Sequence, residues 1–76
     1  MKVTRIEWSS VRDFYEADLD PKDFVEYDDE DDVEMAIIEE LWDRGTTDSE
    51  YTDTFDSETN IPEEFFEKWR ELKNGN

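Results

Sequence analysis

Residues 28–45, DDEDDVEMAIIEELWDRG, carry the clearest structural pattern in the chain. Apolar residues recur along this stretch at helical spacing, at Val33, Ile37, Ile38, Leu41 and Trp42. The acidic run at its start favours the positive end of a helix dipole, and Gly45 at its end is a typical C-terminal cap. We therefore expect a helix over about 31–44, with an apolar face wide enough to form the centre of the core.

A second helix is expected over about 62–73. Pro62 and two glutamates stand at its start, where proline and acidic residues are favoured, and basic residues lie near its end. Its apolar face consists of Ile61, Phe65, Phe66, Trp69 and Leu72. We expect the three aromatic residues of this face to lie in the core, together with Trp8 and Trp42.

The N-terminal residues 2–8, KVTRIEW, are mostly β-branched or aromatic and predict a strand. Val3 falls on one side of the strand alternation, whereas Ile6 and Trp8 fall on the other, so we expect a bulge or a change of face.

The next segments fit more than one structure. The serines at 9–10 are good N-caps and favour a short helix over about 10–17, although the apolar residues from 15 to 19 also alternate as in a strand. Asp20 and Pro21 favour a helical turn or lead into a short strand. Residues 46–60 are rich in Thr, Ser and Asp, and are expected to form a loop that carries a short strand at about 50–56. The sequence as a whole predicts one small acidic domain over 1–76 of the α+β class, with two main helices packed on a small sheet that includes the N-terminal strand.

The charge of the chain is extreme and is confined to one block. The 76 residues include 25 Asp or Glu and 8 Lys or Arg, for a net charge of −17. Residues 23–67 hold nineteen of these acids and one base, whereas the two ends nearly balance. A charge of about 2–8 is enough to keep a small domain soluble, and the excess opposes compaction. Eleven aromatic residues nevertheless favour a folded chain, despite a mean hydropathy of −1.08.

Several kinds of chemistry are disfavoured by the residue types. The chain has no Cys and no His, so it lacks a thiolate nucleophile and the usual general base at neutral pH. Its acidic runs lack the glycine and the closing glutamate of an EF-hand calcium loop, and no phosphate-binding loop or nucleophile elbow is present. We therefore expect neither an enzyme nor a dedicated metal or cofactor site.

The acidic side chains are instead spaced in a way that suits mimicry of nucleic acid. Phosphates recur every ~3.4 Å along a DNA strand, and residues four apart on a helix lie ~5–6 Å apart on one face. Glu39 with Asp43, and Glu63 with Glu67 and Glu71, form such rows without intervening lysines. The acidic side chains expected to contact a partner are Asp28, Asp29, Glu30, Asp31, Asp32, Glu39, Asp43, Asp48, Glu50, Asp53, Asp56, Glu58, Glu63, Glu67 and Glu71. Tyr27 and Tyr51, which are flanked by acids, are the expected aromatic contacts.

Other interpretations of the same residues stay open. A run of acids is commonly no more than a solvated face, and the acids at 28–32 also suit a helix start. The chain also fits a protein-specific inhibitor or an antitoxin-like module, which would bind through Tyr51 and Phe55 and use charge to speed encounter. An acidic accessory subunit of a larger assembly is a third alternative.

In size, charge, lack of cysteine and acidic central block, the whole chain resembles the small acidic inhibitors that bacteriophages use as DNA mimics, and among them the phage inhibitors of the nucleoid protein HU. The resemblance is compositional, because these inhibitors share no motif or single fold. It implies a stoichiometric inhibitor that blocks the DNA-binding surface of a basic protein, with HU as the candidate that the resemblance indicates, and that does not bind nucleic acid itself. No membrane segment is apparent, so we expect action in the cytoplasm, that of the host cell if the protein is phage-encoded. A homodimer would extend the acidic surface.

Overall fold

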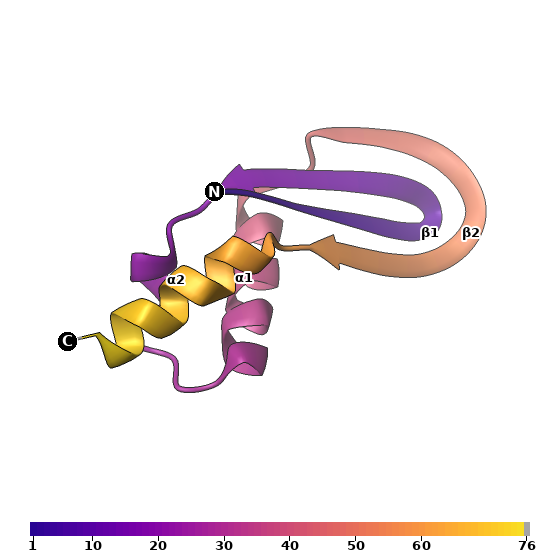
Figure 1. Ribbon diagram of the computed structural model, residues 1–76. Helices are drawn as coiled ribbons and strands as arrows, with labels where there is room; N and C mark the ends of the chain where they lie inside the picture. Colours follow the sequence, from indigo (N-terminus) through magenta and orange to yellow (C-terminus); the bar gives the residue numbers. More distant parts are fainter. Residues whose placement is uncertain (76) are drawn as a thin grey trace.

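The computed structural model describes residues 1–75, which form a helical body from which a long β arm projects (Figure 1). In chain order the elements are β1 (Lys2–Asp18), the 3₁₀ helix η1 (Pro21–Phe24), α1 (Glu30–Arg44), β2 (Asp48–Asn60) and α2 (Glu63–Asn74). The strands pair antiparallel in one two-stranded sheet, so the predicted α+β class is confirmed. The molecule measures 47 × 18 × 18 Å along its principal axes, which is the shape of a short rod.

The central helix is the one predicted, and it begins one residue earlier than expected. The side chain of Asp29 accepts a hydrogen bond from the backbone N–H of Asp31, which caps the start of α1. At the other end Gly45 adopts a φ of 84°, a backbone conformation that favours glycine, and its N–H donates to the carbonyls of Leu41 and Trp42. The helix buries Val33, Ile37, Ile38 and Leu41.

Helix α2 also lies within one residue of its expected bounds at each end, and it packs on η1. Pro62 is the N-cap of α2, so it lies one position before the first helical residue. The indole N–H of Trp69 donates to the carbonyl of Phe24 at 2.7 Å, and the rings of Phe24 and Phe65 meet edge to face at 5.7 Å. Of the two structures that the sequence allows after Asp20, the helical turn is the one that forms: it is η1, against which α2 packs.

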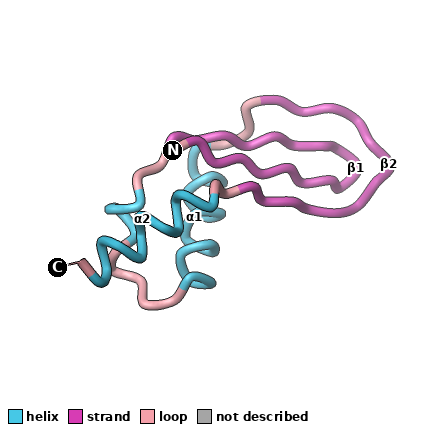
Figure 2. Tube along the Cα trace, viewed as in Figure 1, coloured by secondary structure: helices cyan, strands magenta, loops and turns pink. Residues whose placement is uncertain are grey.

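The expected helix over 10–17 is wrong, because this segment continues β1. The strand folds back on itself near Ser10, whose φ of 66° is left-handed, and Figures 1 and 2 show the two halves side by side. At the base of this fold the N–H of Leu19 donates to the carbonyl of Met1 at 2.8 Å. The strand alternation prevails over the serine caps because it buries Ala17 and Leu19 and lets residues 11–14 pair with β2.

Strand β2 curves around the outside of β1 and pairs with both of its halves (Figure 2). Partners run from Thr4 opposite Asn60 to Ser9 opposite Phe55, and then from Val11 opposite Tyr51 onwards. Residues 52–54 therefore face only the bend at Ser10. The irregularity expected within 2–8 lies instead between Ser9 and Val11, and the short strand expected at 50–56 extends over all of β2.

The core lies in the helical body and at the base of the arm. It consists of Val3, Ala17, Leu19, Phe24, Val33, Ile37, Leu41, Phe65 and Trp69. The prediction of core aromatics is confirmed for Phe65 and Trp69 on α2 and wrong for Trp42, which is 48% exposed. Trp8 and Phe66 are only partly buried. Trp42 lies at the margin of the α1 stripe, where its indole reaches β1 instead of the core.

Candidate functional site

The carboxylates of this chain lie at the surface. Among residues 1–75 no charged side chain is buried. All fifteen acids that the sequence predicts as partner contacts are exposed, whether they belong to α1, α2, β2 or the turn before α1. The surface that they form is available to a partner along the whole molecule.

Every cation in the described part of the chain is held by a carboxylate. Each of the eight Lys and Arg side chains, and the N-terminal ammonium, lies within 4.0 Å of an acid of the same chain. Three of these pairs join distant segments: Lys73 with Asp28 at 3.1 Å, Arg70 with Glu30, and Arg12 with Glu50. Each basic side chain of residues 1–75 is thus paired with an acid of the same chain, although several of them, such as Lys2 and Lys22, stay largely exposed.

Nine acids take part in these pairs, and the other sixteen of the 25 have no cationic partner within residues 1–75. We call these sixteen the unpaired carboxylates; they are Asp13, Asp23, Glu26, Asp29, Asp31, Asp32, Glu34, Glu39, Asp43, Asp48, Asp53, Asp56, Glu58, Glu63, Glu67 and Glu71. Twelve of them are predicted contact residues. The other three predicted acids, Asp28, Glu30 and Glu50, are partly neutralised by their ion pairs.

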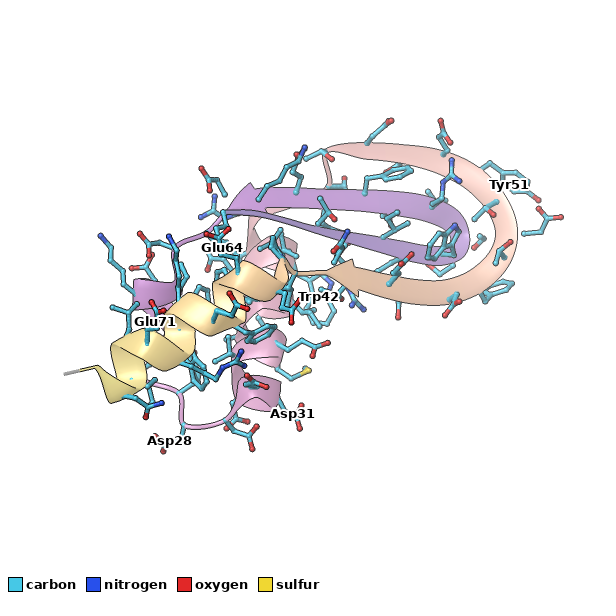
Figure 3. All side chains as sticks on the ribbon, viewed as in Figure 1. Asp28, Asp31, Trp42, Tyr51, Glu64 and Glu71 are labelled. Atoms are coloured by element: carbon cyan, nitrogen blue, oxygen red, sulfur yellow. The ribbon has the colours of Figure 1, made fainter. Side chains whose placement is uncertain are left out.

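The predicted contacts do not gather in one patch. In Figure 3, Asp28 and Asp31 lie at one end of the molecule and Glu71 lies on α2, whereas Tyr51 lies at the far bend of β2. The rows predicted on the helices exist, since Glu39 and Asp43 are exposed on α1 and the three acids at 63, 67 and 71 are exposed on α2. The acidic surface therefore follows the length of the rod from the helical body to the tip of the arm.

One concave acidic region lies between η1 and α1. It is a pocket of about 360 Å³ that is lined by Asp23, Phe24, Glu26, Tyr27, Ala36, Glu39, Glu40 and Asp43. Tyr27, a predicted contact, is half-buried in its wall and stacks on Phe24 at 6.3 Å. Asp23 and Glu26 were not predicted as contacts, because only the fold brings them opposite the outer face of α1.

One partly buried carboxylate joins the arm to the helical body. Glu7 on β1 accepts hydrogen bonds from Arg5 Nε at 2.8 Å and from Trp42 Nε1 at 2.5 Å. Burial alone would raise the pKa of Glu7, but these two hydrogen bonds and the charge of Arg5 outweigh it and hold the pKa below its ordinary value of 4.5. The pKa of the Tyr15 hydroxyl is raised, chiefly because the hydroxyl is partly buried, and to a smaller extent because the negative charges of Glu7 and Asp13 disfavour its ionised form.

The N-terminal ammonium links the start of β1 to its end. The ammonium of Met1 donates to Asp18 Oδ1 at 2.7 Å and to the carbonyl of Leu19 at 2.6 Å. This hydrogen bond and the positive charge lower the pKa of the Asp18 carboxyl. Asp18 is therefore a structural acid of the arm rather than part of the unpaired set.

Comparison with known proteins adds no relative. No protein-family model matches the chain, and no curated protein or solved structure is significantly similar to it. Within residues 1–75 no three acidic side chains are grouped so as to hold a metal ion. Neither helix in this part of the chain has the length and apolar character needed to cross a membrane.

Proposed function

We propose that the protein is a non-enzymatic mimic of nucleic acid that occupies the DNA-binding surface of a basic protein and so blocks DNA binding. The observation that carries the proposal is the division of its charges. The cations of residues 1–75 are tied up in internal ion pairs, while sixteen carboxylates stay unpaired. A surface that only had to be soluble would mix both signs of charge.

The charge density of the rod supports the same function. A net charge of −17 over a length of 47 Å corresponds to one negative charge per about 2.8 Å. Duplex DNA carries one charge per about 1.7 Å of its axis, and a single strand carries one per about 3.4 Å. The protein therefore falls between the two, although its carboxylates are set on a fixed protein surface.

The partner that fits this surface is a protein with rows of Lys and Arg in a nucleic-acid-binding groove. Such a groove gains electrostatic attraction and counterion release from carboxylates as it does from phosphates. The nucleoid protein HU is our first candidate, in the cytoplasm of a host cell, because the chain resembles the phage inhibitors of that protein.

Two charge-matched variants test whether the unpaired carboxylates carry binding. The first, Glu63→Gln/Glu67→Gln/Glu71→Gln, removes the acidic row on α2. The control, Glu16→Gln/Glu40→Gln/Glu64→Gln, removes three acids that are paired with Lys2, Arg44 and Lys68. Both variants have a net charge of −14, so a difference between them reports position rather than total charge.

We expect the first variant to displace labelled duplex DNA from HU roughly tenfold less well than the wild type, and the control to lose clearly less, because each lost phosphate-like contact removes a counterion-release term. Fluorescence anisotropy of the DNA measures both. If the two variants lose the ability to displace DNA to the same extent, binding depends on net charge alone and not on the unpaired carboxylates, which would contradict the proposal.

A second candidate function is favoured by the exposed aromatic residues of β2. Tyr51 is 84% exposed and Phe55 is 74% exposed, which suits a protein-specific inhibitor that binds through an aromatic hot spot. In that case Tyr51→Ala and Phe55→Ala raise the dissociation rate, whereas salt changes chiefly the association rate. Surface plasmon resonance at two salt concentrations separates the two functions.

A further inference from the structure

The distal end of the arm presents large apolar side chains to solvent. Tyr51 and Phe55 are the two most exposed large hydrophobic residues of the described chain, and Val11, directly opposite Tyr51, is 40% exposed. Phe55 is paired with Ser9, so the two rings flank the bend at Ser10. Figure 3 shows Tyr51 on the outer curve of β2, far from both helices.

The fold itself does not use these rings. The core that α1 and α2 cover ends at the base of the arm, where Val3 and Ala17 are buried. In the curve of β2 between the two rings, the N–H of Thr54 donates to Thr52 Oγ1 at 3.2 Å, which is a local contact that does not involve either ring. An aromatic pair that contributes so little to the core is placed where a partner can cover it.

The surroundings of the rings indicate what that partner must be. Asp53 lies between them in sequence and Asp56 follows the second ring, and both belong to the unpaired carboxylates. Glu50 precedes the first ring and is held by Arg12. A partner that covers this tip must therefore offer cations for the carboxylates and flat apolar surfaces for the rings at the same place.

We propose that the tip of the arm mimics an unpaired, single-stranded segment of nucleic acid, and that its partner is a basic groove lined with aromatic side chains. Grooves of this type bind single strands by combining positive charge along the backbone with aromatic residues on which successive bases stack. Duplex DNA keeps the faces of its bases stacked inside the helix, whereas the arm exposes its rings. The inference rests on the proposed function and adds to it a class of partner, proteins that bind single strands, that competition with duplex DNA alone does not require.

The spacing of the rings is compatible with one groove. Four residues of fully extended chain span at most about 13–14 Å, and residues 52–54 of β2 round the bend of β1, since they have no partner between the pairs Ser9–Phe55 and Val11–Tyr51. Both rings can therefore enter a single binding site, with Asp53 between them in the place of a phosphate.

The test is displacement of labelled oligo(dT) from a bacterial single-strand-binding protein built of OB folds, run beside displacement of labelled duplex DNA from HU. We expect the wild type to displace oligo(dT). Tyr51→Ala/Phe55→Ala should do so roughly 10- to 100-fold less well, because each lost stack weakens binding. Tyr51→Phe/Phe55→Tyr keeps both rings and should compete like the wild type. Circular dichroism checks that both variants fold.

Two results would overturn the inference while leaving the proposed function standing. One is a wild type that displaces duplex DNA from HU but no oligo(dT) from the single-strand-binding protein. The other is an alanine variant that displaces oligo(dT) as well as the wild type does. A wild type that displaces neither nucleic acid contradicts the proposed function as well, so the two failures are distinguishable.

Discussion

At the scale of single residues, the balance between paired and unpaired carboxylates depends on a few specific contacts. Glu7 is the clearest of them, because its carboxylate accepts hydrogen bonds from Arg5 in its own strand and from Trp42 on α1. The pair with Arg5 is among the less exposed ion pairs of the molecule, so solvent screens it less than most of the others. Glu7 thus connects the arm to the helical body.

We expect Glu7→Gln to lower the free energy of unfolding by about 1–2 kcal/mol at neutral pH, since hydrogen bonds to a charged group are lost. The pKa of Glu7 is lower in the folded protein than its ordinary 4.5. Its stabilising effect is therefore complete above that value and is lost as the pH falls through the folded pKa.

Urea denaturation of the wild type and of Glu7→Gln, between about pH 3 and 7, measures this effect. The difference between the two proteins should shrink below about pH 4.5. A difference that stays constant over the whole range would show that Glu7 acts through packing rather than through its charge.

At the scale of elements, β2 is unusual because it is a long edge strand without a lysine. Its outer edge has no partner strand within residues 1–75, and its 13 residues include five acids. An exposed edge of this length is a template for pairing with another chain, and charged side chains are a common protection against it. The acids of β2 thus protect the edge against a second copy, and in the proposed function they would also attract a basic partner.

We expect Asp53→Asn/Asp56→Asn/Glu58→Gln to self-associate, because the repulsion between edges falls while the unpaired backbone groups stay. Sedimentation velocity should show a mean mass above that of the wild type at the same concentration. Glu63→Gln/Glu67→Gln/Glu71→Gln has the same net charge with its changes on α2, and serves as the control. If both variants associate equally, total charge rather than the edge governs association.

The homodimer suggested by the sequence stays a prediction. Sedimentation velocity of the wild type in the same experiment tests it.

The elements also show what the sequence can and cannot predict. The two helices are predictable to within one residue because apolar periodicity, an acidic start and Gly45 at the end of α1 all agree. The arm is not, because its bend at Ser10 uses a left-handed serine instead of Gly or Asn, so nothing in the sequence marks a turn.

The exposure of the acids follows from composition, but their pairing does not. The contacts of Arg70 with Glu30 and of Lys73 with Asp28 join positions 40 and 45 residues apart. Only the packing of α2 beside the turn before α1 creates them. The division into paired and unpaired carboxylates, on which the proposed function depends, therefore becomes visible only in the folded chain.

At the scale of the whole molecule, the excess of negative charge acts against folding. The ion pairs lie mostly at exposed positions, where each contributes about 0–1 kcal/mol at most. The repulsion among sixteen unpaired carboxylates on a rod of 47 × 18 × 18 Å is collective. The unpaired carboxylates therefore lower the free energy of unfolding.

We expect added sodium chloride to raise the melting temperature, because it screens the repulsion more than the isolated ion pairs. A gain of about 1 kcal/mol corresponds to roughly 4–8 °C for a domain of this size. Scanning calorimetry at low and moderate salt measures it. Glu63→Gln/Glu67→Gln/Glu71→Gln should be more stable at low salt and respond less. A melting temperature that falls with salt would mean that the ion pairs dominate.

In the proposed function, the protein takes the place of DNA on a basic protein. The most direct measurement is its displacement of labelled duplex DNA from HU, followed by fluorescence anisotropy between about 50 and 200 mM salt. We predict mutually exclusive binding and an affinity for HU that falls steeply over this range, on the order of 10³-fold if six or more charge contacts form. An affinity that barely changes with salt, or a ternary complex in which HU holds the protein and DNA together, would contradict it.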